Sequence, residues 1–127
     1  MKPNETCVIH GASGNTGMFA VQLAKKFGAK VIAITRKQWL KEFGVDYIVD
    51  YNQAVEKILE YSSGKGADVI INSLGEKYWD IGLAVAENRA RIVTFGSLLG
   101  AEVKININQI YNKHISILGV NRREKIS

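Results

Sequence analysis

The sequence has few of the residues that build disulfides, metal centres or membrane spans. Its 127 residues include one cysteine, Cys7, which excludes an internal disulfide and any thiolate-rich metal cluster. The two histidines, His10 and His114, show no ligand spacing with Cys7, whereas a zinc site needs three or four ligands. No apolar run approaches the roughly 20 residues of a membrane helix, and residues 1–5 lack the apolar core of a signal peptide. Together these features predict a cytoplasmic protein that neither enters a membrane nor holds a metal in this stretch.

Basic residues exceed acidic ones, giving a net charge of +5 and a pI near 9.4. Most of them are scattered as pairs, such as Lys25-Lys26 and Arg122-Arg123. No long basic stripe with interleaved aromatic residues is present, so we expect no nucleic-acid partner. Most of these side chains form a solvated surface, and the pair Arg36-Lys37 is the exception considered below.

Six short apolar runs rich in Val and Ile recur along the chain, which is long enough for one compact domain. Most are continuous rather than alternating, as is typical of strands that are covered on both faces of a parallel sheet. The predicted strands are Thr6–His10, Lys30–Ile34, Tyr47–Asp50, Asp68–Ile71, Arg91–Phe95 and Ile115–Leu118.

Segments with helical period lie between these runs. In the first helix we expect Gly17, Ala20, Val21, Ala24 and Phe27 on the inner face, and in the third helix Val55, Ile58 and Leu59. Alternating strands and helices predict an α/β Rossmann fold, a doubly wound six-stranded parallel sheet of order 3-2-1-4-5-6 with helices on both faces, in one domain over residues 1–127. The predicted helices are Gly17–Phe27, Gln38–Phe43, Gln53–Tyr61, Lys77–Ala86 and Asn108–Lys113.

A glycine-rich turn connects the first strand to the first helix, with glycines at 11, 14 and 17. Gly11 suits a tight exit from the strand, Gly14 leaves room for a pyrophosphate to approach the backbone, and Gly17 permits close packing of helix on strand. The free N–H groups at the helix start, around Asn15 to Gly17, point at the anion, and the helix dipole favours it. This position predicts a dinucleotide site.

The residues after the second strand indicate which dinucleotide binds. An NAD site carries an acid there, about 20 residues past the glycines, that bonds the ribose 2′-hydroxyl. Here the strand ends Ile34-Thr35-Arg36-Lys37, and no acid follows before Glu42. A carboxylate repels a 2′-phosphate and an Arg-Lys pair attracts it, so NADP(H) is preferred over NAD(H).

Several stretches together resemble the cofactor domain of the medium-chain dehydrogenase/reductase family, which includes zinc alcohol dehydrogenases and quinone reductases. The resemblance covers nearly the whole chain and is carried by residues 2–12, 22–33, 43–51, 66–75 and 90–96. It departs from the family pattern in Ala12, at the first position of the usual glycine triplet, and in the short connection between strands two and three. The resemblance implies cofactor contacts from Ser13, Gly14, Asn15, Thr16, Gly17, Thr35, Arg36, Lys37, Tyr51, Asn72, Ser73, Leu74, Gly96, Ser97, Leu98 and Gly119.

The resemblance also implies an oxidoreductase that passes hydride between nicotinamide and a small alcohol, carbonyl or quinone. The family's GroES-like catalytic domain should precede Met1, so we expect a fragment that binds NADP(H) but catalyses no reaction alone. The sequence of this stretch does not show whether the parent protein uses zinc. In the family, strand-six edges often pair between subunits, which makes a homodimer a further expectation. Two alternatives stay open: an atypical short-chain reductase, since Gly11-x-x-Gly14-x-x-Gly17 fits that group too, and a non-catalytic nucleotide-sensing module.

Three other features have simpler explanations than catalysis. His10 ends a buried strand, so packing explains it. Trp39 follows the cofactor-selecting turn, but packing on a neighbouring helix is favoured over stacking on adenine. Tyr61 and Lys65 have the Tyr-x-x-x-Lys spacing of short-chain dehydrogenases, yet they fall at a helix end and in a glycine-flanked loop, so chance explains the match.

Overall fold

The computed structural model describes residues 2–11, 15–72, 76–94 and 102–119. Their six strands form one parallel sheet in the order β3-β2-β1-β4-β5-β6, which confirms the predicted doubly wound architecture. The strands are β1 (Thr6–His10), β2 (Lys30–Ile34), β3 (Tyr47–Val49), β4 (Ala67–Asn72), β5 (Ala86–Thr94) and β6 (Ser116–Gly119).

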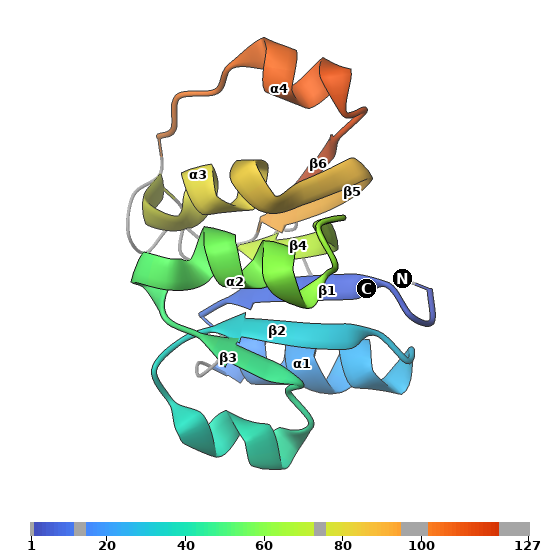
Figure 1. The fold of residues 1–127 in the computed structure, drawn as a ribbon, viewed down its shortest axis with the longest axis vertical. Helices are drawn as coiled ribbons and strands as arrows, with labels where there is room; N and C mark the ends of the chain where they lie inside the picture. The colour runs from blue at the N-terminus through green and yellow to red at the C-terminus, as the bar shows by residue number, and fades with distance from the viewer. Residues whose placement is uncertain (1, 12–14, 73–75, 95–101, 120–127) are drawn as a thin grey trace, which may run out of the picture.

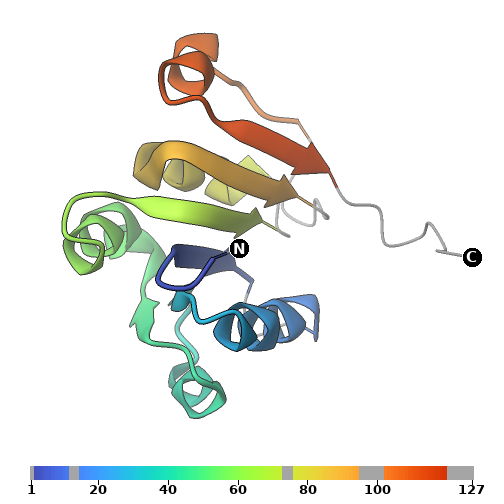
Figure 2. The ribbon, with the colours of Figure 1, turned by 90° about the vertical axis from the view of Figure 1, so that its right-hand side faces the viewer.

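Helical segments connect consecutive strands and cover both faces of the sheet. In Figure 1, α2 and α3 lie in front of the sheet and α1 lies behind it; Figure 2 gives the view from the side. Among the described helices, none has the length and apolar character needed to cross a bilayer. They are α1 (Asn15–Lys26), η1 (Gln38–Phe43), η2 (Tyr51–Gln53), α2 (Ala54–Tyr61), α3 (Glu76–Val85) and α4 (Ile107–Asn112), where η marks a 3₁₀ helix.

The core has two layers because alternate residues of each buried strand face opposite sides of the sheet. On one side, Cys7 and Ile9 of β1 pack with Ala20, Val21 and Ala24 of α1. On the other side, residues of β1, β2, β4 and β5 pack with α2 and α3. The fully buried residues there include Val8, Ile32, Ile58, Ile70 and Ile92. The small side chains of α1 bring that helix close to the sheet, as the sequence pattern predicted.

Three details differ from the sequence-based expectations. Strand β5 begins at Ala86 rather than at Arg91. The apolar pattern missed its first half because Asn88 and Arg89 are polar and exposed and the pairing with β4 is irregular there. Phe27 is 49% exposed because α1 ends at Lys26 and the chain has already turned away. Val55 is 37% exposed because α2 begins at Ala54, so that Ala54 and Ile58, four residues apart, face inward instead.

Charged side chains connect the strands at the amino edge of the sheet, where each strand begins. Glu5, just before β1, accepts two hydrogen bonds from the Arg91 guanidinium of β5, at 2.8 and 3.2 Å. This pairing holds the pKa of Glu5 below its ordinary value, against the effect of burial. Asp68 Oδ2 of β4 accepts a hydrogen bond from the Thr6 backbone N–H at 2.8 Å. Both contacts join segments that are more than 60 residues apart in the sequence.

Asp46 plays the same part between β2 and β3. Its Oδ2 accepts from the Val31 backbone N–H and from Lys25 Nζ of α1, both at 2.8 Å. One carboxylate thereby joins a strand, a helix and the start of the next strand. The carboxylates of this edge stabilise the fold.

Candidate functional site

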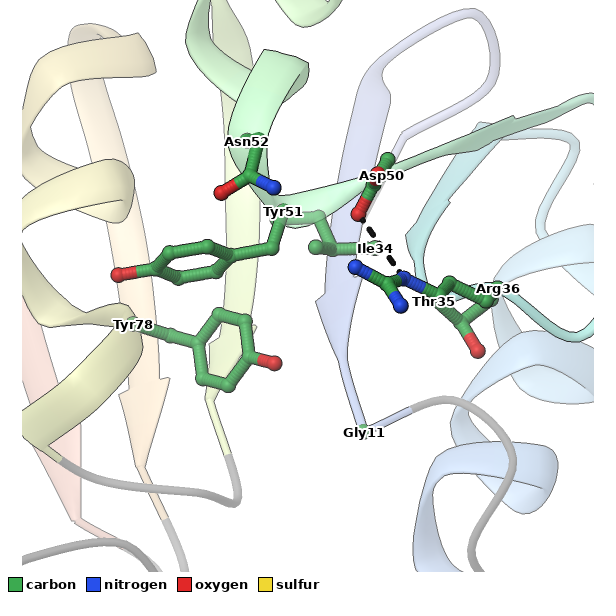
Figure 3. Close-up of a pocket in the computed structure, with 8 residues that line it drawn as sticks. All are labelled: Gly11, Ile34, Thr35, Arg36, Asp50, Tyr51, Asn52 and Tyr78. Atoms are coloured by element: carbon green, nitrogen blue, oxygen red, sulfur yellow. Dashed lines mark hydrogen bonds and ion pairs between the residues drawn. The ribbon is translucent and has the colours of Figure 1, made fainter.

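A pocket of about 560 Å³ opens at the carboxyl edge of the sheet, where β1, β2 and β3 end. Open parallel sheets bind their ligands at this edge, because the loops that follow neighbouring strands converge there. Figure 3 shows two tyrosine rings on one side of the pocket and an arginine with an aspartate on the other. The pocket is lined by Gly11, Ile34, Thr35, Arg36, Asp50, Tyr51, Asn52 and Tyr78.

The charged wall comes from the ends of β2 and β3, which pair with each other through Ile34 and Val49. Arg36 Nε donates to Asp50 Oδ1 at 3.4 Å, with the two side chains 79% and 41% exposed. Beside them, Thr35 N–H donates to the Val49 carbonyl at 3.0 Å, and Thr35 Oγ1 accepts from Lys37 N–H at 3.2 Å. These bonds order the turn after β2 and leave the guanidinium facing solvent and the pocket.

The aromatic wall joins three elements that are distant in the sequence. The Tyr51 ring of η2 meets the Tyr78 ring of α3 edge to face, with centroids 5.0 Å apart. Tyr78 in turn meets the His10 ring at the end of β1, with centroids 4.9 Å apart. Burial raises the pKa of Tyr78; the nearby charges of Tyr51 and Asp50 act in the same direction and Arg36 acts against them.

His10 lies beneath this wall and is fully buried. Burial lowers its pKa to about 3, so the ring is neutral at physiological pH. It packs against Tyr78, which agrees with the packing role predicted from the sequence. Cys7, in the same strand, is also fully buried, and burial raises the pKa of its thiol to about 12.

Helix α1 begins five residues after the last residue of β1, His10. Gly11 has φ of +72°, a left-handed conformation that favours glycine and that turns the chain out of the strand. The helix begins at Asn15, and Gly17 is buried within it. The predicted contacts Ser13 and Gly14 lie outside the described residues. Helix α1 thus begins a few residues after the carboxyl end of β1, and the N–H groups of its first turn have no acceptor within the helix.

The structure brings three of the predicted contacts together in the pocket: Thr35, Arg36 and Tyr51. Lys37 is exposed and directly precedes η1. Asn72 is buried at the end of β4, next to His10, and Gly119 ends the edge strand β6, three strands away from β1 in the sheet. The other predicted contacts, Ser73, Leu74, Gly96, Ser97 and Leu98, lie outside the described residues.

Asp50 and Tyr78 are pocket residues that the sequence analysis missed. Asp50 was assigned only to the third strand, although its place at a strand's carboxyl end marks it as a candidate. Tyr78 lies within a helical pattern, and nothing in the sequence places that helix against the end of β1.

Two further features lie outside the pocket or carry no site. Trp39, which follows the cofactor-selecting turn, packs edge to face on Phe43 of its own helix, with the ring centroids 5.7 Å apart. Within the described ranges, His, Cys, Asp and Glu side chains form no group that could hold a metal ion.

The sequence also matches known proteins over most of its length. The family described as zinc-binding dehydrogenase matches residues 16–126. The chain belongs to this family. The resemblance to medium-chain dehydrogenases and reductases is therefore confirmed.

Three proteins illustrate the similarity. Quinone oxidoreductase 1 of Escherichia coli is 30% identical over 119 aligned residues, and the match covers 89% of this chain and 36% of that protein. The structure of the Escherichia coli quinone oxidoreductase complexed with NADPH superimposes with a TM-score of 0.82 at 28% identity, covering 94% of this chain and 39% of that one. An NAD-dependent alcohol dehydrogenase gives a TM-score of 0.87 at 27% identity, covering 94% and 37%. The chain thus spans little more than a third of the length of such relatives.

Proposed function

We propose that this chain is the NADP(H)-binding domain of an oxidoreductase that passes hydride between the nicotinamide and a small alcohol, carbonyl or quinone. One observation carries the proposal: the pocket at the carboxyl edge unites Gly11 after β1, Thr35 and Arg36 after β2, and Tyr51 after β3. Family membership supports it, as does the NADPH complex of the similar quinone oxidoreductase.

The residues present fit the adenosine end of a dinucleotide. The Tyr51 and Tyr78 rings offer apolar surface, the Thr35 hydroxyl lies beside the pocket, and Arg36 adds a cation. Helix α1 supplies free backbone N–H groups and the positive end of its dipole for the diphosphate, near residues 13–17. The contacts at Asn72, Ser73, Leu74, Gly96, Ser97, Leu98 and Gly119 remain predictions for the rest of the cofactor.

The bound cofactor would supply the hydride, and the chain's own residues would bind and orient it. The groups that handle the substrate would come from polypeptide outside these 127 residues, since the match covers only 36% of the length of a similar quinone oxidoreductase. We therefore expect nucleotide binding without turnover from this domain alone. Strand β6 forms one edge of the sheet with all four residues exposed, which supports the expected homodimer through that strand. The cytoplasmic location stays a prediction.

The preference for NADP(H) rests on local charge. Similar structures include an NADPH complex and an NAD-dependent enzyme, so the fold alone does not select the cofactor. At the end of β2, Arg36 and Lys37 are both exposed and no acid occupies the strand end itself. A guanidinium binds a phosphate more strongly than it binds a ribose hydroxyl.

Titration calorimetry of the chain with NADPH and NADH tests the proposal. We expect saturable binding of both, tighter for NADPH. Arg36→Gln should weaken NADPH binding about tenfold, as for one lost charge-assisted hydrogen bond, and change NADH binding less than about twofold. Lys57→Gln, which removes a positive charge from α2 outside the pocket, is the matched control. Tighter binding of NADH than of NADPH would overturn the cofactor preference. If the chain binds neither NADPH nor NADH, the proposed function is overturned.

A further inference from the structure

We propose that Asp50 is a specificity-determining residue that opposes a 2′-phosphate beside Arg36 and so reduces the preference for NADP(H) that the pocket would otherwise have. The inference rests on the proposed function and assigns a part in it to a residue that the glycine-turn pattern does not include. It makes the balance of two facing charges, rather than Arg36 alone, the determinant of nucleotide choice.

The sheet places the two charges side by side. Arg36 follows β2 and Asp50 follows β3, and these strands pair up to their last residues, Ile34 and Val49. Both side chains line the same pocket, with Arg36 Nε 3.4 Å from Asp50 Oδ1. In Figure 3 the carboxylate lies directly against the guanidinium. A phosphate that reaches the guanidinium therefore meets the carboxylate at close range as well.

Within the described residues, the carboxylate of Asp50 does not stabilise the fold in the way that the carboxylates of the amino edge do. Asp50 occupies the position before η2, where an aspartate often accepts a hydrogen bond from the helix backbone, but its side chain makes no such cap. Only its main-chain carbonyl is used there, accepting from Gln53 N–H at 3.1 Å. Asp46 and Asp68, in contrast, each accept a backbone N–H at 2.8 Å. Asp50 also contributes little through its ion pair, because an exposed pair with a long contact adds little stability.

The two nucleotides differ in how they meet a carboxylate. A phosphate monoester carries a charge of about −1.5 to −2 near neutral pH and is repelled by it. A ribose 2′-hydroxyl is neutral and can donate a hydrogen bond to it. Asp50 therefore disfavours one ligand and tolerates the other. The influence of the Asp50 and Arg36 charges on Tyr78, in opposite directions, is consistent with both acting within this pocket.

The test is Asp50→Asn in the 127-residue chain, with dissociation constants measured by calorimetry. Adenosine 2′,5′-bisphosphate and adenosine 5′-monophosphate join NADPH and NADH as probes, because they differ only in the 2′-phosphate. We expect the variant to bind NADPH and the bisphosphate about five- to tenfold more tightly, the factor for removing one like charge at close range in water-like surroundings. Binding of NADH and of the monophosphate should change less than about twofold.

Glu60→Gln is the matched control. Glu60 is an exposed acid of α2 that pairs with Lys57 at 3.4 Å, outside the pocket, and its substitution changes the net charge by the same amount. An unchanged or reduced NADPH preference in Asp50→Asn, with nucleotide binding retained, would overturn the role of Asp50 and leave the proposed function intact. An equal gain in Glu60→Gln would also overturn it, because the effect would then belong to overall charge. If the unsubstituted chain binds none of the four nucleotides, the proposed function is overturned instead.

Discussion

The amino edge and the carboxyl edge of the sheet each carry a pocket of similar size, about 510 and 560 Å³, but they use charged side chains differently. At the amino edge, Glu5 and Arg91 form two short hydrogen bonds, and Asp68 accepts a backbone N–H. At the carboxyl edge, Arg36 and Asp50 form a single long contact, with their side chains 79% and 41% exposed. The two pockets therefore do not differ much in size. The edges differ in how tightly their charged side chains are hydrogen-bonded.

This difference separates residues that stabilise the fold from residues that are available to a ligand. Short, partly buried contacts between distant segments lose stability when they are broken. Exposed and weakly paired charges contribute little to folding, so they can exchange partners when a ligand arrives. Substitutions of the paired charges at the amino edge should therefore change stability without changing nucleotide binding, and substitutions of the exposed charges at the carboxyl edge should do the reverse.

The largest effect is expected at Gly66, which precedes β4 at the amino edge. It has φ of +95°, and an added Cβ would clash with the Val85 carbonyl oxygen. Gly66→Ala should destabilise the domain by roughly 3 kcal/mol or more, through the steric clash and the left-handed strain together. Urea denaturation followed by circular dichroism measures the loss.

Gly64→Ala is the matched control for that experiment. Gly64 has φ of +80°, but an added Cβ would meet nothing within 4 Å. Only the strain then remains, at about 1 kcal/mol. Equal losses for the two variants would contradict the close packing of Gly66 on the junction between α3 and β5.

An intermediate effect is expected from acidification, through His10. Burial lowers its pKa from 6.5 to about 3, so the folded state keeps the ring neutral while the unfolded chain takes up a proton below pH 6.5. The domain should therefore lose stability as the pH falls from 6.5 to 4.5, by roughly 1.4 kcal/mol per pH unit at most. His10→Phe should remove most of this slope in denaturation curves measured across that range.

His114→Asn serves as the control, because this exposed histidine has φ of 54°, which asparagine tolerates. The slope should persist in that variant. A slope in His10→Phe equal to that of the unsubstituted chain would show that another group takes up the proton.

A smaller effect is expected at Glu5. Glu5→Gln should cost about 1–2 kcal/mol at pH 7, because it weakens the paired hydrogen bonds with Arg91. The Arg91 contact lowers the pKa of Glu5 below 4.5, so this contribution is complete above pH 4.5 and is lost as the pH falls through the lowered value. The difference between variant and unsubstituted chain should therefore shrink in acid.

Nucleotide affinity provides the second half of the Glu5 experiment. The NADPH dissociation constant of Glu5→Gln should stay within about twofold of that of the unsubstituted chain. A large loss of NADPH affinity with unchanged stability would contradict the claim that the amino edge stabilises the fold and the carboxyl edge binds the nucleotide.

Much of the fold could be predicted from the sequence because its signals are local. Continuous Val and Ile runs indicated buried strands such as Thr6–His10, and the small residues of α1 indicated close packing on the sheet. The early start of β5 could not be predicted, since the residues around Asn88 are polar and pair through an irregular register. Phe27 and Val55 were placed inward by periodicity, but their exposure depends on where each helix ends or begins.

The candidate site was predictable only in part. The glycine turn and the end of β2 predicted Thr35 and Arg36 as site residues, because the order of strand, turn and helix identifies which residues follow the second strand. Asp50 and Tyr78 reach the pocket through strand pairing and through the packing of α3, both of which are tertiary. A pattern that is read along the chain reports which residues end a strand, but it does not report which residues face one another across the pocket.

The most direct test of the account is a ¹⁵N-resolved NMR titration of the chain with NADPH, since amide shifts report on both edges of the sheet in one experiment. The account predicts that the largest shifts fall at the carboxyl edge, in Gly11, in residues 35–37 and 50–52, and in Tyr78. Residues 2–6 and 62–66, around the pocket at the amino edge, should change little. Shifts concentrated in that second group, with the carboxyl edge unchanged, would contradict the central claim.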